Sequence, residues 1–411
     1  MPEFFNVVPP TEALDILLRN LRDIVTDKEA LPLSQTLGRV TAEEVIANEN
    51  LPAFPRSAMD GFSVRAKDTF GATEGLPAYL DIIGEVPMGQ TPQITVSEGQ
   101  AARAYTGGML ANGADAVVMI ENTLEVDEKT IEVLRPAALG EHVIQVGEDI
   151  RVGERVLPNG HKIRPQDLGG LAGLGLTSAI VAKRPRIAIV STGDELVPPD
   201  QAPLPGQIRN INTSIISALV IKAGGVPVVL AIAKDDFGSQ RAAALSGLEQ
   251  ADILVFSAGS SVSSRDMTAE IFQSFGNPGV LLHGISHKPG KPTIVAMIKD
   301  KPAIGLPGNP VSAFVVFNLL VKPAIHTLMG LDRSTEPLTV QAKLIRDVAS
   351  IAGREDHVQV SLIYENDSLL ADPIFGKSNL VYTLIKADGS ITIPMDTGGV
   401  YAGQSVPVQL Y

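Results

Sequence analysis

Hydrophobic and polar positions change period several times along the chain, and one short apolar run predicts the clearest element. Residues 252–256 are almost wholly apolar and β-branched, which is typical of a strand buried on both faces of a sheet. Small residues follow at 257–261, and then a helical pattern with Asp266 at its start. A strand, a small-residue loop and a helix N-terminus form a geometry that receives an anion. A plain strand-to-helix turn capped by Ser and Asp is the alternative at this point.

The same alternation of apolar runs and helical patterns extends over residues 183–330. Strands are predicted over 186–190, 226–232, 252–256, 293–298 and 303–306, with an extended piece near 280–286. Helices are predicted over 213–223 and 238–249, from 266, and from 308 to 329. This order indicates a doubly wound parallel sheet, in which ligands bind beyond the carboxyl ends of the strands.

The rest of the chain is predicted to be mostly β. Residues 51–144 are expected to form an inserted β domain, because short β-rich runs alternate there with Gly/Pro turns. The strands expected in it cover 79–83, 93–96, 116–120 and 130–134. Residues 1–50 and 145–182 are expected to form a discontinuous helical and linking domain, and 331–411 a C-terminal small β domain. Helices are expected within 10–30, near 39–47 and near 166–174, the last packing on the first two. The predicted fold class is therefore multidomain α/β plus β.

Composition narrows the class of protein. The chain has 411 residues, enough for two to four domains, and its 45% hydrophobic content is typical of a globular protein. A net charge of −13 argues against a general nucleic-acid partner. The absence of cysteine excludes disulfides, thiolate nucleophiles and Cys-ligated metals. No signal peptide and no stretch of about 18 apolar residues is evident, so we expect a cytoplasmic protein with no membrane partner.

Candidate chemistry gathers in the loops after the α/β strands. Small, acidic and lysine residues occupy 191–195, 234–236, 257–266, 288–292 and 307–310. Each has an ordinary explanation alone, since Asp236 could cap a helix and Lys288 could be a solvated charge. Together, the lysines and backbone N–H groups suit phosphates, and the carboxylates suit Mg²⁺. No Walker A loop, paired histidine ligands or nucleophile elbow is present.

Six motifs in a fixed order point to a known family. They are 57–62 (SAMDGF), 106–118 (TGG with GADAVV), 147–150 (GEDI), 191–196 (STGDEL), 288–292 (KPGKP) and 305–312 (GLPGNPVS). On these motifs the chain resembles the molybdopterin molybdenumtransferases, the MoeA proteins related to the E domain of gephyrin. The resemblance implies a homodimer of four-domain subunits with a MogA-like α/β domain. It also implies insertion of molybdate into adenylylated molybdopterin, with Mg²⁺ as cofactor and release of AMP.

The resemblance also implies roles for individual residues. The catalytic candidates are Asp60, Thr106, Glu195, Asp266 and Lys288. The metal candidates are Asp235, Asp236 and Asp266, with the choice between the first two left open. The substrate-binding candidates combine the strand-end loops with two positions in the last domain: Ser257, Gly259, Ser261, Lys291, Pro307, Gly308, Asn309, Arg354 and Ser378.

One loop departs from the family pattern. The usual Ser-Gly-Gly-Val-Ser-Val-Gly is changed here, with Ala258 and Ser263 in place of two glycines. A Cβ at a position that needs positive φ costs about 1 kcal/mol. Two alternatives therefore stand beside the main interpretation: a molybdopterin-binding paralogue or scaffold with weak activity, and a molybdopterin adenylyltransferase. The second would lack the Ser-Ala-Met-Asp-Gly motif and the inserted β domain.

Overall fold

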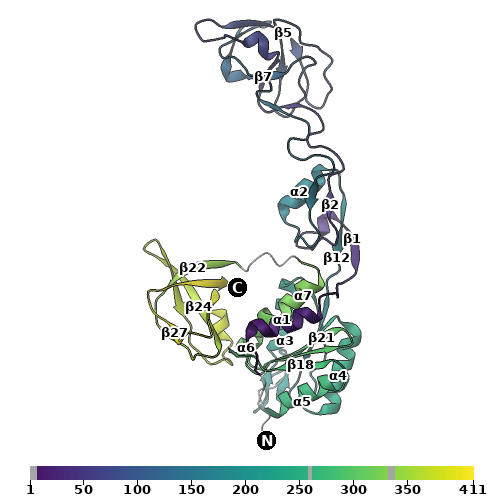
Figure 1. The fold of residues 1–411 in the computed structure, drawn as a ribbon, viewed down its shortest axis with the longest axis vertical. Coiled ribbons are helices and arrows are strands. Elements are labelled where there is room, and N and C mark those ends of the chain that lie inside the picture. The colour runs from purple at the N-terminus through teal and green to yellow at the C-terminus, as the bar shows by residue number, and fades with distance from the viewer. Residues whose placement is uncertain (1–6, 258–261, 332–337) are drawn as a thin grey trace. The chain divides into compact units, whose positions relative to one another are not determined.

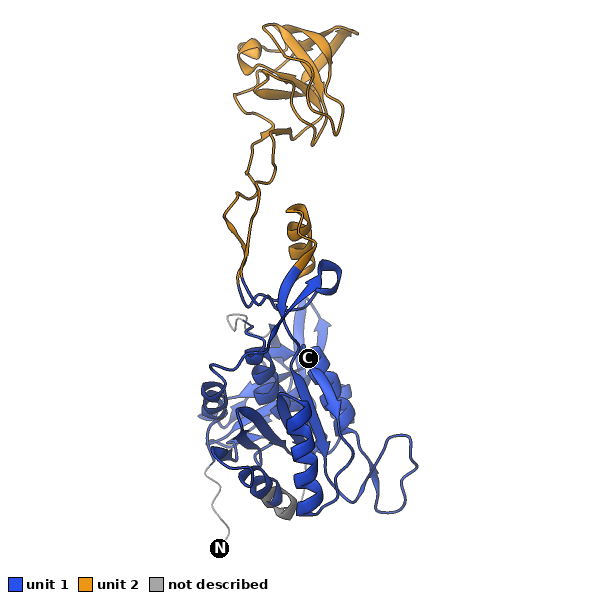
Figure 2. Ribbon diagram, turned by 90° about the vertical axis from the view of Figure 1, so that its right-hand side faces the viewer, with its two compact units in different colours: residues 1–43, 159–163, 179–411 blue, residues 44–158, 164–178 orange. Residues whose placement is uncertain are grey.

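The computed structural model describes residues 7–257, 262–331 and 338–411, without the side chains of 262–266. The chain forms two compact units, coloured separately in Figure 2. Unit 1 comprises residues 1–43, 159–163 and 179–411, and unit 2 comprises 44–158 and 164–178. Each unit is described by itself. The finer four-part division with its stated bounds stays a prediction.

Unit 1 contains a six-stranded sheet in the order β16-β13-β17-β21-β20-β18. Its strands are β13 (Arg186–Ser191), β16 (Val226–Val229), β17 (Ile253–Ser257), β18 (Gly279–His283), β20 (Ile294–Ile298) and β21 (Lys301–Leu306). β13, β16, β17 and β21 run parallel, whereas β20 runs antiparallel to both of its neighbours. The α/β class is confirmed. The exception at β20 arises because a tight turn, and no crossover helix, joins β20 to β21.

Helices cover both faces of this sheet, as a doubly wound fold requires (Figure 1). One face packs against α1 (Pro10–Asn20), α3 (Asn212–Lys222) and a long helix that begins at Pro310. The other face packs against α4 (Phe237–Gln250) and α5 (Val262–Gln273). Alternate residues of each central strand enter the two cores; in β17, Ile253 and Val255 face one and Leu254 and Phe256 the other. Both faces are therefore buried, which explains the unbroken apolar runs.

The long helix that begins at Pro310 is the most apolar helix of the α/β part. It consists of α6 (Pro310–Val316), the π-helical turn η4 (Phe317–Val321) and α7 (Lys322–Leu328). In the described chain, it is the single helix long and apolar enough to cross a membrane, with a mean hydropathy of 1.6. It is not an uninterrupted apolar run, since Asn318, Lys322 and His326 lie within it. In addition, 61% of its apolar window is buried, and Val316, Leu320 and Ala324 lie in the sheet core. These features are those of a core helix.

The C-terminal part of unit 1 is a small closed barrel. Its strands are β22 (Thr339–Leu344), β24 (Glu355–Glu365), β25 (Ser368–Pro373), β26 (Gly389–Ile393) and β28 (Ser405–Leu410). They pair in a ring, β24-β25-β22-β28-β26 and back to β24. A short strand, β19 (His287–Lys288), comes from the α/β part and pairs in parallel with β24. The barrel is thereby joined by backbone hydrogen bonds to one of the lysine loops.

Unit 2 carries the inserted β domain. Its sheet order is β7-β4-β6-β5-β9-β8. The strands are β4 (Gly61–Val64), β5 (Ala78–Glu85), β6 (Gln100–Ala104), β7 (Ala116–Met119), β8 (Thr123–Asp127) and β9 (Thr130–Val133). The predicted strand at 93–96 is wrong, since only an isolated bridge at Thr95 forms there. Helix α2 (Pro165–Gly173) is confirmed, but the helix predicted near 39–47 is not found; that stretch contains β2 (Val45–Ile46).

Short ribbons and turns complete the described elements. The ribbons pair β1 (Lys28–Pro32) with β12 (Ser178–Ala182), β2 with β11 (Arg155–Leu157), β3 (Arg56–Ser57) with β10 (Val143–Ile144), β14 (Leu196–Val197) with β15 (Ile208–Arg209), and β23 (Val348–Ala349) with β27 (Gly399–Val400). The short helices are η1 (Leu33–Gln35), η2 (Ala66–Thr69), η3 (Ile120–Asn122) and α8 (Tyr382–Ile385). Helix α1 packs in the α/β core through Ala13 and Leu17. The predicted packing of α2 on it stays a prediction.

Replacing Phe256 tests whether the face under α4 and α5 supports the sheet. Phe256 is fully buried and meets the ring of Phe272 edge-on, with centroids 5.4 Å apart. We expect Phe256→Ala to lower the free energy of unfolding by about 3–5 kcal/mol, because it leaves a cavity between two layers. Urea denaturation followed by circular dichroism measures the change. Phe70→Ala, at a side chain 64% exposed, is the control and should change little; equal losses in both variants would contradict the expectation.

Candidate functional site

The crevice at the carboxyl ends of β13 and β17 organises the candidate site. Ser191 and Ser257, the last residues of these two strands, lie opposite each other. β13 continues through α3 to β16 on one side, whereas β17 continues through α5 to β18 on the other. The two connections leave in opposite directions, so a crevice opens between them, and ligands of open α/β sheets bind in such crevices.

Asn212, at the start of α3, ties two walls of the crevice together. Its side-chain Nδ2 donates to Ser257 Oγ over 2.9 Å and to the carbonyl oxygen of Gly308 over 2.7 Å. Asn212 is 8% exposed, and its Oδ1 has no hydrogen-bond partner within the described chain. The amide thus fixes the spacing between the end of β17 and the turn that follows β21. Sequence reasoning missed this role, because an Asn at a helix start reads as an ordinary cap.

The acids after β13 and β16 form a mutual pair. The N–H of Asp194 donates to Asp235 Oδ2 over 3.4 Å, and the N–H of Asp235 donates to Asp194 Oδ1 over 3.3 Å. The buried side chain of Gln240 also donates to Asp235, from Nε2 to Oδ1 over 3.3 Å. Glu195 folds back over Gly193, where a Cβ would lie 2.6 Å from Glu195 Oε2. The carboxylates of Asp194, Glu195 and Asp235 are therefore adjacent at this edge.

Asp236, next in the chain, has a different environment from Asp235. It is the N-cap of α4, and its Oδ1 accepts the N–H of Ser239 over 2.8 Å. Hydrogen bonds from Ser239 hold the pKa of Asp236 below its usual value. The ordinary explanation considered for Asp236, a helix cap, is thus present in the structure. Of the two neighbouring acids, Asp235 is the one joined to another carboxylate of the crevice.

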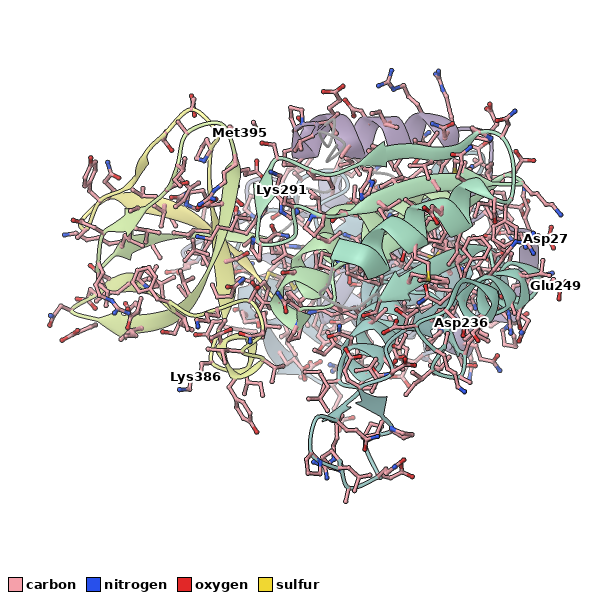
Figure 3. The ribbon with its side chains drawn as sticks, turned by 90° about the horizontal axis from the view of Figure 1, so that it is seen from below. Asp27, Asp236, Glu249, Lys291, Lys386 and Met395 are labelled. Carbon is pink, nitrogen blue, oxygen red and sulfur yellow. The ribbon has the colours of Figure 1, made fainter. Side chains whose placement is uncertain are left out.

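The lysine loop lies against the barrel. Pairing of β19 with β24 sets Lys288 opposite Asp356, and the exposed Lys291 follows three residues later. Arg354 makes a bidentate ion pair with Asp356, at 2.8 Å from Nε to Oδ1 and 3.2 Å from Nη2 to Oδ2. Figure 3 labels Lys291 at the side of the α/β part that faces the barrel. The candidates Lys288, Lys291 and Arg354 are thus brought together, with part of the Arg354 charge neutralised by Asp356.

His287 is the buried residue of this junction. Its ring is 2% exposed, packs edge-on against His357 with centroids 5.6 Å apart, and has no hydrogen-bond partner on either nitrogen in the described chain. Burial, and then the nearby His357, lower the pKa of His287 to about 4. The imidazole therefore stays neutral between Lys288 and the barrel over the physiological range.

The loop after β21 makes a second contact with the barrel. Pro307 is buried, and Asn309 donates from Nδ2 to Ser378 Oγ over 2.9 Å. The N–H of Val311 donates to the carbonyl oxygen of Ser378 over 3.1 Å. The candidates Pro307, Gly308, Asn309 and Ser378 are therefore neighbours in space, although Ser378 lies almost 70 residues away from the others in the chain.

Asp60 and Thr106 are brought together in unit 2. Asp60 Oδ1 accepts both the N–H of Thr106 over 2.7 Å and its hydroxyl over 2.9 Å. The two hydrogen bonds, the backbone one first, hold the pKa of Asp60 below its usual value, although the carboxylate is exposed. The neighbouring Gly61 is required by close approach, since a Cβ there would lie 2.0 Å from the carbonyl oxygen of Val118.

Three candidates lie outside what the structure describes. Gly259 and Ser261 fall in the gap at 258–261, and so does the changed residue Ala258. Asp266 lies in α5, which begins at Val262, so Asp266 is not at the helix start as predicted; its side chain is not described. Among the described residues, no group of three His, Asp or Glu side chains could by itself hold a metal ion.

Comparison with known proteins assigns three consecutive regions of the chain. Residues 8–175 match the MoeA N-terminal region (domain I and II), 188–327 a probable molybdopterin binding domain, and 341–411 the MoeA C-terminal region (domain IV). These matches define the class: a protein of MoeA architecture with a molybdopterin-binding α/β domain. The MoeA regions on both sides of the α/β domain are present. A molybdopterin adenylyltransferase would lack the inserted β domain of the first region, so this alternative is not favoured.

Individual relatives agree with this class. The chain is 33% identical to the molybdopterin molybdenumtransferase of Bacillus subtilis, over 93% of this chain and 90% of that protein. It is also 33% identical to molybdopterin molybdenumtransferase 2 of Mycobacterium tuberculosis, over 92% and 94%. The solved structure of the MoeA protein of Pyrococcus horikoshii OT3 matches 99% of this chain and 100% of its own, with 33% identity and a TM-score of 0.86. The chain belongs to the molybdopterin molybdenumtransferase family. Proteins of this family are transferases of molybdenum cofactor biosynthesis.

Asn212→Asp tests whether the amide positions the crevice loops. A carboxylate cannot donate to the carbonyl oxygen of Gly308, and it adds a negative charge beside the candidate site for an anion. We expect the KM for the molybdopterin substrate to rise about tenfold, equivalent to ~1.4 kcal/mol, with kcat less affected. Steady-state kinetics measure the change. Asn20→Asp, on the exposed face of α1, is the matched control; an unchanged KM in the Asn212 variant would contradict the positioning role.

The lowered pKa of His287 predicts a pH dependence of stability. The unfolded chain takes up a proton near the ordinary pKa of 6.5, whereas the folded protein does so only near 4. Stability should therefore be complete above pH 6.5 and fall as the pH drops toward 4, by roughly 3 kcal/mol in all.

His287→Phe should remove this part of the dependence, because both ring nitrogens lack partners and the edge-on contact with His357 can persist. Urea unfolding at pH 7.5 and pH 5 gives the slope for each protein. The comparison uses the change in the free energy of unfolding between the two pH values. Any destabilisation that the larger ring causes equally at both pH values therefore cancels. The same slope in the variant would show that other groups cause the acid sensitivity.

Proposed function

We propose that this protein inserts molybdate into adenylylated molybdopterin and releases AMP, with Mg²⁺ as cofactor. The observation that supports it is the convergence, at one sheet edge, of the Asp194–Asp235 pair, the Ser257 and Gly308 loops, and the lysine loop. Loops from both the α/β part and the barrel take part. Relatives named molybdopterin molybdenumtransferase supply the reaction class.

Electrostatics explains why this arrangement suits the reaction. The substrate phosphates and the oxometallate are anionic, and the protein carries a net charge of −13. A local cluster of cations must therefore offset the repulsion, and the exposed Lys288 and Lys291 supply it together with the partly neutralised Arg354. No protein nucleophile is required, since an oxygen of the oxometallate can attack the molybdopterin phosphorus as the anhydride bond breaks and AMP leaves with the bridging oxygen. The dithiolene sulfurs then replace oxygens on the metal, which leave as water.

The described carboxylates fit a Mg²⁺ ion that substrate phosphate completes. A carboxylate oxygen of Asp194 accepts the N–H of Asp235, and a carboxylate oxygen of Asp235 accepts the N–H of Asp194. Both side chains are exposed, and their carboxylates keep further lone pairs that can bind a cation. Mg²⁺ is commonly held by one or two carboxylates together with phosphates and water. Bound there, the ion would supply polarisation of the phosphoanhydride. Asp266 is a further proposed ligand from α5.

Asp60 and Thr106 of unit 2 are also proposed to take part in the reaction. The hydrogen bonds from Thr106 keep the Asp60 carboxylate ionised. We also propose that the protein works as a homodimer in the cytoplasm, so that unit 2 of one subunit can serve the α/β site of another. Analytical ultracentrifugation tests the dimer, and a monomer with full activity would exclude it. The alternative of a binding scaffold would be supported by tight ligand binding without AMP release.

Two adjacent aspartates give a matched test of the metal site. Asp235→Asn should lower the rate of AMP release about a hundredfold, comparable to removing one group that stabilises transition-state charge, with partial recovery at high Mg²⁺. Asp236→Asn should retain activity, because Asn caps a helix as well as Asp does. The assay uses adenylylated molybdopterin, molybdate and Mg²⁺, with AMP measured by chromatography. Equal losses in both variants, or none in Asp235→Asn, would contradict the assignment.

A further inference from the structure

The turn that carries Thr106 is attached to the rest of unit 2 on both sides of that residue. It follows β6 and is closed by a hydrogen bond of 2.8 Å from the N–H of Gly108 to the carbonyl oxygen of Tyr105. After Thr106, the N–H of Gly107 donates to the carbonyl oxygen of Ser57 over 2.8 Å, and the N–H of Ser57 donates to that of Gly108 over 2.9 Å. These backbone contacts fix the glycine half of the turn.

A side chain holds the other half of the turn. The phenol of Tyr105 donates to Oε2 of Glu85, the last residue of β5, over 2.5 Å. Thr106 comes next in the chain, and both its N–H and its hydroxyl donate to Asp60 Oδ1. The peptide unit that joins Tyr105 to Thr106 carries this N–H, so the phenol anchors the residue on which the orientation of the N–H depends.

An irregularity in the sheet brings Glu85 to this turn. β5 and β6 pair in parallel, but their register shifts: Ile82 lies opposite Ala101, whereas Glu85 lies opposite Arg103. β5 therefore has one extra residue over this interval. Gly84 lies within the shift with a φ of 144°, in the region that favours glycine. Bulges of this kind redirect side chains, often next to functional sites.

The groups around Tyr105 keep its phenol protonated. The hydrogen bond to Glu85 is the first cause that raises the pKa of Tyr105 above its usual value, and the charges of Glu85 and Asp60 act in the same direction. Arg103 opposes them, but its Nη1 already pairs with Glu125 Oε1 over 2.7 Å. The phenol therefore remains a hydrogen-bond donor, and Glu85 remains its acceptor.

We propose that Tyr105 and Glu85 are positioning residues of the proposed reaction: their hydrogen bond holds Thr106 where it donates twice to the Asp60 carboxylate. The inference rests on the proposed function in one respect, the part that Asp60 and Thr106 take in the reaction. The link from Glu85 through Tyr105 to Thr106 does not depend on which reaction the protein performs. Both positioning residues act through the turn and need no contact with substrate.

The same strand provides a matched control. Tyr79, near the other end of β5, donates from its phenol to Glu132 Oε1 over 2.7 Å. It is exposed as Tyr105 is, and a hydrogen bond to a glutamate raises its pKa in the same way. Its partner lies directly opposite on β9, so this hydrogen bond does not involve the turn. Tyr79→Phe therefore removes an equivalent hydrogen bond and leaves the turn untouched.

Hydrogen exchange tests the link without turnover. The amide of Thr106, followed by NMR at pH 7, should exchange about tenfold faster in Tyr105→Phe than in the wild-type protein, because the N–H spends less time bonded to Asp60. Glu85→Ala should have the same effect. Glu85→Gln should keep the wild-type rate, since the oxygen of a Gln amide still accepts the phenol. Tyr79→Phe should also keep it.

Steady-state kinetics of AMP release test the positioning role. Tyr105→Phe and Glu85→Ala should each lower kcat about fivefold and leave KM unchanged, because the loosened turn affects Asp60 and not substrate binding. Glu85→Gln should restore kcat, and Tyr79→Phe should not lower it. A wild-type kcat in Tyr105→Phe, or an equal fall in Tyr79→Phe, would overturn the positioning role.

The two measurements together separate this inference from the proposed function. A wild-type protein that releases no AMP, with faster Thr106 exchange in Tyr105→Phe and not in Tyr79→Phe, would overturn the proposed reaction and leave the link standing. AMP release by the wild-type protein, with neither exchange nor kcat changed in Tyr105→Phe, would overturn the inference and leave the reaction standing.

Discussion

The side-chain amide of Asn212 is the interaction on which the arrangement of the crevice depends. One nitrogen donates both to Ser257, at the end of β17, and to the carbonyl of Gly308, in the turn after β21. Those strands are hydrogen-bonded neighbours in the sheet. Buried polar groups are costly when unpaired, so two loops that share one buried donor are held at a defined separation. The end of β17 at Ser257 and the turn that contains Gly308 are thereby held at a fixed distance from each other.

The same edge also connects the α/β part to the barrel. Backbone pairing of β19 with β24 and the hydrogen bonds of Ser378 to the loop after β21 make two separate attachments. Lysines from one part and an arginine from the other meet there because of these attachments. A protein that is acidic overall can in this way hold anionic ligands, since position and local charge matter more than the total. The neutral His287 at the centre of the junction adds no charge to it.

Much of the fold follows from local patterns, and the errors have physical causes. The runs at 186–190 and 252–256 are strands because both faces of the sheet are covered, which demands apolar residues at every position. Antiparallel β20 was missed because an apolar run carries no direction. Residues 39–47 have a helical spacing of apolar positions, but they cross between the units as extended chain, paired through bridges at Val40 and Thr41. The helix at 310–328 is apolar because it is enclosed by a core, and its composition alone does not distinguish a core from a membrane.

By itself, the sequence determined the family, the α/β class and the sheet edge at which the candidate residues gather, because motifs and strand-end loops are local features. Only the tertiary structure separated Asp235 from Asp236, which are adjacent in sequence yet accept hydrogen bonds from different partners: the backbone N–H of Asp194 in one case and the first turn of α4 in the other. It also gave Asn212 its role, since that role consists of contacts to residues 45 and 96 positions away. Hydrogen bonds between distant segments depend on packing geometry, and no local pattern contains that information.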